Sequence, residues 1–417
     1  MLIVPLLVFC GKNNSTDEGK DNNNENKEGT EVTPPDNTDQ TDPFELAGAE
    51  FQSGDELLAT NRNVEKFLTE VTYPDKDWSY TEVLDYYGGF DGVNFSWAKL
   101  PDSDKPEVYS IRWSEDELES GAMTLHLADA LGWEADVDIT EGSLYVNITN
   151  LVPNDSYTYS VTTASGKVLR EGNFTTTGSL HQCFFRGNKK GTKGARNCRD
   201  LGGWATQDGK HVKYRKIYRG GRLNEKWDVM MNNAGKKELQ VEGIMAQLDL
   251  RGVDDVMDVP ALPDMAFCAP VIEQGGKTML VSDHEKTKQC FEFVVECLRE
   301  NKPVYFHCSL GRDRTGTLGI LLLGLLGVPE GDISKEYEVT YFAPSGYSVS
   351  SSEKDSNPKP IFKNTRKAWV YSDVAPYFWE MAGENGTFAD GVEKYLLEVA
   401  QVSQKDIDDY RTMMLTD

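Results

Sequence analysis

Five residues separate Cys308 from Arg314 in a loop that also contains a glycine, and this loop constrains the chain more than any other segment. The apolar run 304–306 leads into the loop, and the apolar run 318–326 leads out of it. Such runs predict a buried strand and a buried helix. We therefore expect the loop to lie between a strand and a helix N-terminus, where backbone N–H groups bind an anion.

The residue types in this loop suit attack on phosphorus. A helix N-terminus and nearby cations lower the pKa of a cysteine from about 8.5 to roughly 3.5–7.5, so we expect Cys308 to be a thiolate nucleophile. Arg314 is expected to hold two phosphate oxygens at once, and Thr315 to donate its hydroxyl to the thiolate. His307 either orients the loop from behind or is a satisfied core histidine, and the two roles are compatible. The residues whose backbone is expected to bind phosphate are Ser309, Leu310, Gly311 and Arg312.

The strand, loop and helix resemble those of the cysteine-dependent phosphatases, the protein tyrosine phosphatase superfamily with its Cys-x5-Arg loop. The segment 195–204 (Ala-Arg-Asn-Cys-Arg-Asp-Leu-Gly-Gly-Trp) narrows the resemblance. It is similar to the entry segment of the bacterial tyrosine phosphatase-like and lipid phosphatase-like group. The segments 217–221 and 247–251 are similar to the strands that follow in that group. The resemblance covers about residues 182–417.

The chain departs from that group at two positions. Cys198 stands where the group usually has an aromatic or aliphatic residue, and Arg312 stands where many members have lysine. Cys198 could approach Cys308 and act as a resolving thiol under oxidation. The alternative is that Cys198 is a small buried residue of the core.

The resemblance implies an α/β catalytic domain with a parallel central sheet flanked by helices. It also implies hydrolysis of phosphoric monoesters through a cysteinyl-phosphate intermediate, with no cofactor. In such sheets ligands bind at the carboxyl ends of the strands, where Cys308 is expected. The expected strands lie near 217–219, 246–250, 265–269 and 304–306, and the expected helices near 283–300 and 315–326.

Hydrolysis needs a general acid to protonate the leaving oxygen, and two carboxylates are candidates. Asp313 lies inside the loop, directly before Arg314, where related bacterial enzymes place their acid. Asp283 could instead lie on a movable loop, as in the eukaryotic tyrosine phosphatases. An aspartate that precedes a helix is also a good N-cap, which is the structural alternative for Asp283.

The expected substrate is a phosphorylated protein, with phosphotyrosine as the first choice. The alternative is a phosphoinositide or an inositol phosphate, because Arg312 adds a cation to the loop and other arginines could line its rim. Those arginines could equally pair with carboxylates such as Asp200 or Asp249. We expect Asp200 to support the site. The arginines concerned are Arg199, Arg219 and Arg251.

Two other classes of protein are compatible with parts of the sequence. The chain could be a phosphate-binding or adhesion protein without catalysis, but the intact Cys308, Asp313 and Arg314 argue against that. A rhodanese-like sulfurtransferase would not need the entry segment 200–203. The seven cysteines form no Cys-x-x-Cys pair and no His–Cys metal spacing, so no metal site is predicted. The net charge of −25 argues against a nucleic-acid partner, which would require a basic face.

The N-terminal residues are expected to direct and tether the protein. Residues 1–10 form an apolar run that ends in Cys10, and they resemble the end of a bacterial lipoprotein signal with Cys10 as the lipidated residue. Residues 11–43 are polar and acidic with few apolar side chains, so we expect a disordered tether. Together these segments predict an enzyme in the bacterial cell envelope, lipid-anchored and either periplasmic or surface-exposed.

Between the tether and the catalytic domain, two regions are expected. Residues 44–87 read as a partly helical lead-in, with helical periodicity over 54–71. Residues 88–178 contain short alternating runs, such as 93–97 and 108–113, that are typical of a separate β-sandwich. This region resembles a fibronectin type III domain, with Tyr159 near the position of its corner tyrosine.

Overall fold

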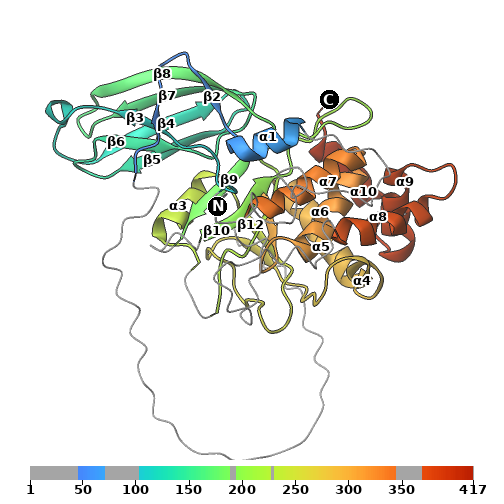
Figure 1. The fold of residues 1–417 in the computed structure, drawn as a ribbon. Helices are drawn as coiled ribbons and strands as arrows, with labels where there is room; N and C mark the ends of the chain where they lie inside the picture. Colours follow the sequence, from blue (N-terminus) through green and yellow to red (C-terminus); the bar gives the residue numbers. More distant parts are fainter. Residues whose placement is uncertain (1–45, 71–102, 188–193, 227–229, 344–368, 417) are drawn as a thin grey trace, which may run out of the picture.

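The computed structural model of the protein describes residues 46–70, 103–187, 194–226, 230–343 and 369–416 (Figure 1). Within these residues the chain forms three β-sheets and a set of helices. The expected signal segment at 1–10, the tether at 11–43 and the strand at 93–97 lie outside the described residues. None of the helices among the described residues is long and apolar enough to cross a membrane.

A six-stranded sheet forms the centre of the C-terminal half. Its order is β13 (Ala266–Cys268), β12 (Ala246–Asp249), β14 (Val304–His307), β11 (Ile217–Gly220), β10 (Gly194–Asp200) and β9 (Gln182–Arg186). The first four strands run parallel, as expected from the sequence, whereas β10 and β9 add an antiparallel edge. The fold is therefore mixed α/β, and the predicted parallel sheet is extended by β10, which lies largely in the entry segment, and by β9, which precedes it.

Each face of this sheet is covered by its own core. Val304 and Phe306 of β14 pack on one face with α5 (His284–Arg299) and α6 (Asp313–Leu325). Tyr305 packs on the opposite face, in a core that includes Leu239 of α3 (Asn233–Val241). Successive side chains of a strand point to opposite faces, so an uninterrupted apolar run such as Val304–Phe306 suits a strand covered on both sides.

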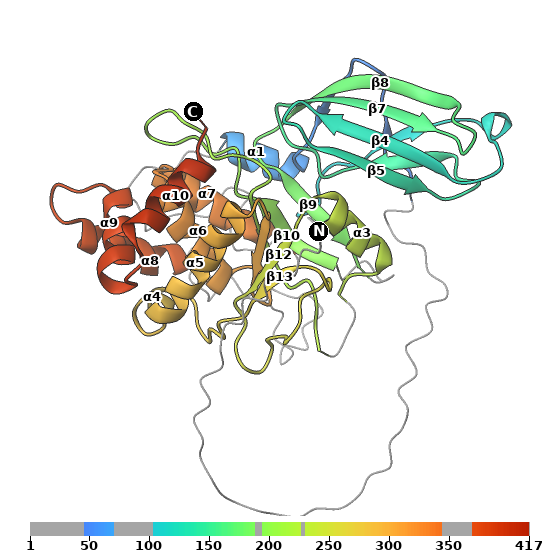
Figure 2. The same cartoon turned by 180° about the vertical axis from the view of Figure 1, so that it is seen from behind.

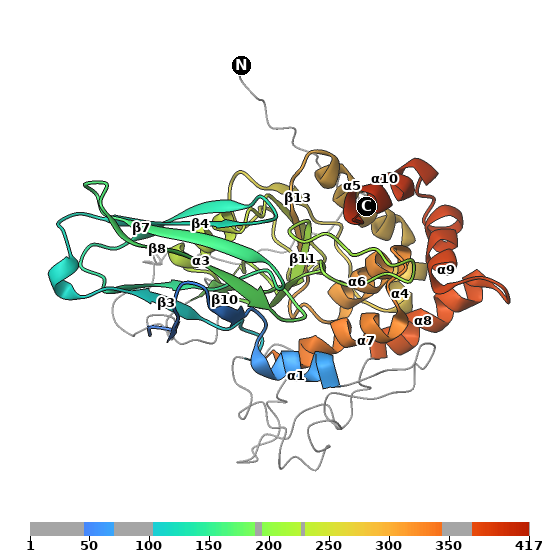
Figure 3. The same cartoon turned by 90° about the horizontal axis from the view of Figure 1, so that it is seen from above.

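The other helices of the C-terminal part of the chain pack around α5 and α6 (Figures 1 and 3). The tail of the chain packs there, because Phe388 and Tyr410 belong to the same core as α6. These helices are α4 (Lys277–Val281), α7 (Glu330–Glu338), α8 (Trp369–Ala382), α9 (Phe388–Lys394) and α10 (Gln404–Met414).

Two smaller sheets of the N-terminal half share one core, and we call them the N-terminal sheet pair. One has the order β1 (Ala49–Glu50), β3 (Tyr109–Arg112), β6 (Tyr145–Ile148). The other has the order β2 (Glu56–Leu58), β8 (Val168–Thr177), β7 (Ser156–Thr162), β4 (Met123–Asp129), β5 (Glu134–Ile139). Side chains from both sheets, among them Ile111 and Leu125, meet in the shared core.

The lead-in expected at 44–87 is divided in the structure. β1 pairs with β3 and β2 pairs with β8, so these short strands complete the sheet pair rather than precede it. Helix α1 (Arg62–Glu70) follows and packs Phe67 into the core of the catalytic half. The helical periodicity expected over 54–71 is confirmed only over 62–70, because Leu57 and Leu58 lie in β2 instead. Two- and three-residue strands carry too little pattern to be predicted from sequence.

The corner-type hydrogen bond expected of Tyr159 is made instead by Tyr157, two residues earlier in β7. The hydroxyl of Tyr157 accepts a hydrogen bond from the Val152 amide at 2.9 Å, five residues upstream. Tyr157 is 1% exposed. A corner tyrosine bonds in this way to the preceding backbone, and Tyr159 does not make this bond.

The sheet pair lies beside β9 and α3 of the catalytic half (Figure 2). Polar contacts join the two parts. The Trp133 indole donates to the Val241 carbonyl at the end of α3, at 3.0 Å. Asn150 exchanges two hydrogen bonds with the backbone of Phe184 in β9. These bonds hold the sheet pair against α3 and β9 of the catalytic half.

Candidate active site

Cys308 follows the last residue of β14, the strand in the middle of the parallel part of the sheet. The next four residues turn into α6, whose first helical residue is Asp313. Every residue of α6 from Thr315 onward is buried. This burial explains why the run after the loop is apolar all round, and it fixes the N-terminus of α6 against the loop.

The carbonyl groups of the loop all point away from its centre. The Cys308 carbonyl accepts from His307 Nδ1 at 3.2 Å, and the Ser309 carbonyl accepts from the Arg222 amide at 3.4 Å. The carbonyls of Leu310 and Gly311 accept from the Asn197 side-chain amide at 3.2 and 3.1 Å. In a trans peptide the C=O and the following N–H point in opposite directions. The N–H groups of residues 309–312 therefore face the opposite side and form a cradle for an anion.

Gly311 is required by the path of the loop. Its φ of 72° lies in the left-handed region, and a Cβ at this position would lie 2.4 Å from the backbone of Gly220 in β11. Only glycine satisfies both constraints without moving the loop. The close approach brings the Gly311 carbonyl to Arg219, whose Nη2 donates to it at 2.7 Å.

A buried charge network supports the loop from behind. Glu336 of α7 accepts from Arg199 Nε at 2.6 Å and from Arg219 Nη1 at 2.7 Å. Arg199 also donates to the Asn197 side chain at 2.6 Å, and that side chain holds the loop carbonyls. Burial lowers the pKa of Arg219 to about 10, which still leaves the guanidinium charged at neutral pH. Through Asn197 and Arg199, the entry segment thus contacts and supports the catalytic loop.

The hypothesis that three arginines line the rim of the site is wrong. Arg199, Arg219 and Arg251 are each exposed by 1% or less. Arg199 and Arg219 pair with Glu336, and Arg251 forms a two-pronged ion pair with Asp249. The sequence left pairing with carboxylates open as the alternative, and the structure selects it.

Cys308 lies at the base of the cradle and is 3% exposed. Burial alone would raise the pKa of its thiol, but the Arg314 guanidinium and the Thr315 hydroxyl and amide outweigh burial and lower this pKa below its ordinary value. The Thr315 hydroxyl is itself buried and has no hydrogen-bond partner among the described residues. Arg314 is anchored by its Nη1, which donates to the Ile272 carbonyl at 2.9 Å.

Replacing Thr315 with valine should shift the titration of Cys308 to higher pH. The isosteric change removes the hydroxyl that stabilises the thiolate, so the thiolate forms at a higher pH than in the wild type. The measurement is the pH dependence of Cys308 alkylation by iodoacetamide, followed by mass spectrometry of the peptide that contains Cys308. Thr412→Val on the exposed face of α10 is the matched control. An unchanged midpoint in Thr315→Val would show that the hydroxyl does not act on the thiolate.

His307 is a neutral support of the loop. Its Nε2 accepts from the Gln247 side-chain amide at 2.9 Å, and its Nδ1–H donates to the Cys308 carbonyl. Burial lowers the pKa of His307 to about 4, so the ring carries no charge at neutral pH. Both roles considered for His307 therefore hold together, since the satisfied core histidine also orients the loop.

The two candidate acids lie in different surroundings. Asp313 is the first residue of α6 and forms a two-pronged pair with Arg312, at 2.8 and 3.2 Å. Its side chain is 29% exposed. Asp283 occupies the N-cap position of α5 and pairs with Lys286 at 2.8 Å. Thus Asp313 adjoins the cradle directly, whereas the described contacts of Asp283 lie at the start of α5.

A third carboxylate adjoins the loop and was not predicted. Ser309 donates its hydroxyl to Asp255 Oδ2 at 2.7 Å. Asp255 lies in the segment after β12, and the ends of β12 and β14 are adjacent in the sheet. The alternation of strands and loops predicts that this segment borders the site, but the sequence does not say which of its aspartates turns toward the loop.

Asp200 supports the site indirectly. Its carboxylate accepts from His181, from the Gly202 amide and from the Arg215 amide, and so closes the turn between β10 and β11. These two strands carry Asn197 and Arg219, the residues that hold the loop carbonyls. Asp200 is therefore a residue of the fold behind the site and makes no described contact with Cys308.

Cys198 lies opposite Cys183 on the neighbouring strand. Both are buried in the core on the α3 face of the sheet, whereas Cys308 belongs to the core on the other face. This placement favours the alternative in which Cys198 is a buried residue of the core.

Nearby, ligand atoms of His181, Cys183 and Glu242 lie within 4.8 Å of one another. The His181 ring nitrogens already contact Asp200 and the Asn150 carbonyl, at 3.1 and 3.0 Å, so internal hydrogen bonds satisfy this cluster.

A thiolate at the base of an anion cradle is an arrangement for covalent transfer of a phosphoryl group. The parallel strand before Cys308 and the buried helix after it place the chain in the class of cysteine-dependent phosphatases. More narrowly, the chain belongs to the tyrosine phosphatase family, because the model described as "Tyrosine phosphatase family" matches residues 191–416, more than half of the 417 residues.

Curated relatives agree with this family. A protein of Cupriavidus necator whose name marks it provisionally as a tyrosine-protein phosphatase is 28% identical over 166 residues, which cover 34% of this chain and 59% of the relative. A tyrosine-protein phosphatase of Nostoc commune is 36% identical over 67 residues, covering 16% of this chain and 22% of that protein. The chain thus spans less than two thirds of each of these relatives.

Proposed function

We propose that the protein is a phosphoric monoester hydrolase that acts on phosphotyrosine in proteins through a phosphorylated Cys308. The observation that carries the proposal is the cradle: four loop carbonyls face outward, their N–H partners face inward, and a thiol of lowered pKa lies at the base. Cys308 attacks phosphorus, and the amides and Arg314 stabilise the equatorial oxygens as charge spreads over them. The names of both relatives support a protein substrate.

The alternative substrate, a phosphoinositide or inositol phosphate, has less support. It would need several cations near the cradle to bind additional phosphates. Among the described residues, Arg199, Arg219 and Arg251 are buried in ion pairs, and Arg312 is paired with Asp313. The described surroundings of the cradle therefore suit a substrate with a single phosphate group.

The test of the proposed function is phosphate release by the full-length chain at pH 5 to 7, with a chelator present. The substrates are a phosphotyrosine peptide, phosphoserine and phosphothreonine peptides, phosphoinositides and inositol hexakisphosphate, with Cys308→Ser as the control. We expect release from the phosphotyrosine peptide that is lost in Cys308→Ser. Preference for an inositol substrate would replace the substrate proposal. No release, or equal release by Cys308→Ser, would point to a non-catalytic phosphate-binding or adhesion protein.

Asp313 is proposed as the general acid, and its role predicts a dependence on the leaving group. Asp313→Asn should lower kcat for phenyl phosphate by about 10²–10⁴-fold, because phenolate leaves poorly without a proton. It should lower kcat for 2,4-dinitrophenyl phosphate far less, because that anion leaves unaided. Asp283→Asn and Asp255→Asn are the matched controls. A leaving-group-dependent loss in either control, with none in Asp313→Asn, would reassign the acid.

Location in the cell envelope through a lipid on Cys10 is also proposed, together with a separate fibronectin type III-like domain in the N-terminal half. The apolar run before Cys10 and the polar stretch 11–43 support the anchor. The corner-type bond from Val152 to Tyr157 supports the domain assignment. Labelling of expressing bacteria with a fatty-acid analogue should mark the wild type and not Cys10→Ala. Equal labelling, or none in either protein, would rule out the anchor.

A further inference from the structure

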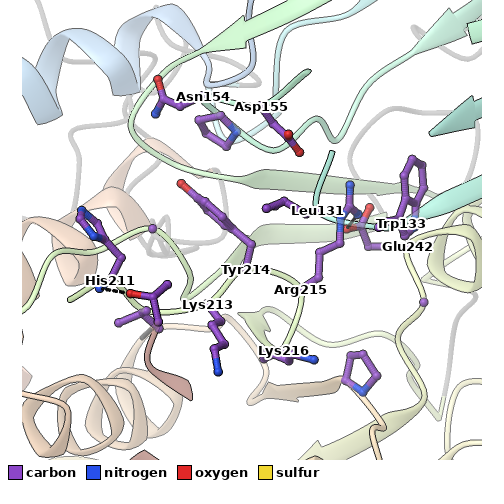
Figure 4. Close-up of a pocket in the computed structure, with 17 residues that line it drawn as sticks. Leu131, Trp133, Asn154, Asp155, His211, Lys213, Tyr214, Arg215, Lys216 and Glu242 are labelled. Atoms are coloured by element: carbon purple, nitrogen blue, oxygen red, sulfur yellow. Dashed lines mark hydrogen bonds and ion pairs between the residues drawn. The ribbon is translucent and has the colours of Figure 1, made fainter. Parts of the chain in front are cut away.

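A cavity of about 760 Å³ lies at the junction between the N-terminal sheet pair and the catalytic half (Figure 4). Its volume lies in the range of roughly 300–1,000 Å³ that small-molecule sites occupy, and such sites often form where two parts of a protein meet. Leu131, Trp133 and Asp155 line it from the sheet pair, and Tyr214, Lys216 and Pro303 line it from the catalytic half.

This cavity is separate from the active site. Lys216 and Pro303 immediately precede β11 and β14, so the cavity lies at the amino ends of these strands. The catalytic loop follows the carboxyl end of β14. A four-residue strand spans about 13 Å at roughly 3.3 Å per residue. The cavity and the catalytic loop therefore lie at opposite ends of the parallel strands of the same sheet.

The walls of the cavity are held in place by Arg215. Its φ of 58° is left-handed, a conformation that non-glycine residues adopt only where the surroundings impose it. Its guanidinium bonds Asp129 Oδ2 at 3.2 Å and Glu242 Oε1 at 2.6 Å, and lies 4.2 Å from the centre of the Trp133 ring. A wall fixed in advance costs a ligand little ordering entropy on binding.

One polar atom of this cavity lacks a hydrogen-bond partner within the described part of the chain. Asp155 is 8% exposed, and its Oδ1 accepts from the Ser156 amide at 2.7 Å. Its Oδ2 is buried and makes no hydrogen bond. The carboxyl group points into the cavity (Figure 4). Leaving such an acceptor unpaired costs about 1–3 kcal/mol, and a donor from a ligand would remove that cost.

We propose that this cavity binds a ligand that carries an ammonium or guanidinium group on an apolar stem. The unpaired oxygen of Asp155 would accept a charge-assisted hydrogen bond from the cation. The stem would lie among Leu131, Trp133, Tyr214 and the proline rings that line the cavity. The same chemistry occurs in a free amine and in a basic side chain of a peptide.

The lysines that line the cavity do not prevent this binding. Lys213 donates its ammonium to the Thr412 carbonyl at 3.3 Å, toward the end of α10 and away from Asp155. Lys216 and Lys213 are less buried than Asp155, and salt screens charges near solvent more strongly than buried ones. Arg215, the remaining cation of the lining, is already paired with Asp129 and Glu242. The Asp155 carboxylate is therefore the buried charge of the lining that a cationic ligand would pair with.

The test is isothermal titration calorimetry of the full-length protein with probes that share one stem length. n-Butylguanidinium presents a cation and pentanoate presents an anion. We expect n-butylguanidinium to bind at millimolar concentration and pentanoate not to bind. Asp155→Asn should weaken binding of the cation by at least about tenfold, since a hydrogen bond to a charged group is worth roughly 1.5–3 kcal/mol.

A blocked Gly-Arg-Gly peptide distinguishes a free cationic ligand from a basic side chain of a peptide. Tighter binding of the peptide than of n-butylguanidinium indicates a basic side chain.

The variant is designed to keep the fold. The asparagine side-chain oxygen can still accept from the Ser156 amide, so the turn before β7 is retained. Asp116→Asn on the exposed segment 115–117 is the matched control, and both variants should keep the wild-type melting temperature and phosphatase activity. Equal affinity of Asp155→Asn and the wild type for n-butylguanidinium, preference for pentanoate, or no binding of the cation by the wild type would overturn the proposal. None of these results depends on catalysis.

Discussion

Replacing Arg314 with lysine should lower kcat/KM for an aryl phosphate by at least about 10²-fold. Removal of one preorganised donor to a transition-state oxyanion costs about 10²–10³ in rate. Lysine keeps the charge but cannot form two parallel hydrogen bonds to the phosphoryl oxygens. It also lacks the second arm with which Arg314 reaches the Ile272 carbonyl.

The kinetic measurement compares Arg314→Lys with Arg299→Lys. Arg299 is a surface arginine that makes ion pairs with Asp406 and Asp409, and it does not contact the cradle. We expect Arg299→Lys to retain wild-type kcat/KM. If Arg314→Lys stays within about tenfold of the wild type, bidentate binding by Arg314 is not part of the mechanism.

Glu336→Gln should destabilise the protein by about 3–5 kcal/mol, the usual cost of removing one partner from a buried ion pair. Glu336 is 1% exposed and balances both Arg199 and Arg219. The amide keeps the shape of the side chain but removes the charge, which leaves two buried guanidiniums to repel each other. This is a large part of the 5–15 kcal/mol that holds most proteins folded.

Urea unfolding of Glu336→Gln and of Glu398→Gln, an exposed control, measures this cost. We expect Glu398→Gln to lie within about 0.5 kcal/mol of the wild type. Activity should also fall in Glu336→Gln, because Arg219 carries both the bond to Glu336 and the bond to the Gly311 carbonyl. A variant with wild-type stability and activity would show that the network does not support the loop.

The parallel core and the catalytic loop could be predicted from sequence because their signals are local. The apolar run at β14, the loop from Cys308 to Arg314 and the apolar α6 are contiguous. Asn197 was part of the recognised entry segment, but its contact with the loop carbonyls joins residues 113 positions apart or more. No local pattern specifies such a contact.

The arginines show why burial could not be inferred from residue type. Arg199, Arg219 and Arg251 suggested a basic rim, because arginine is rarely fully buried. Each is buried because a carboxylate lies beside it, and the partner of the first two, Glu336, comes from α7, more than 100 residues later. Sequence alone likewise could not show that Asp255 would reach Ser309 across the ends of two adjacent strands.

The measurement that tests the central claim most directly is detection of phosphate on Cys308. The full-length protein would be mixed with a phosphotyrosine peptide, quenched in acid during turnover, digested and analysed by mass spectrometry. The account predicts a peptide containing Cys308 that carries one phosphoryl group, and its absence in Cys308→Ser together with loss of phosphate release. Turnover without any phosphorylated Cys308, at an undiminished rate in Cys308→Ser, would contradict the mechanism.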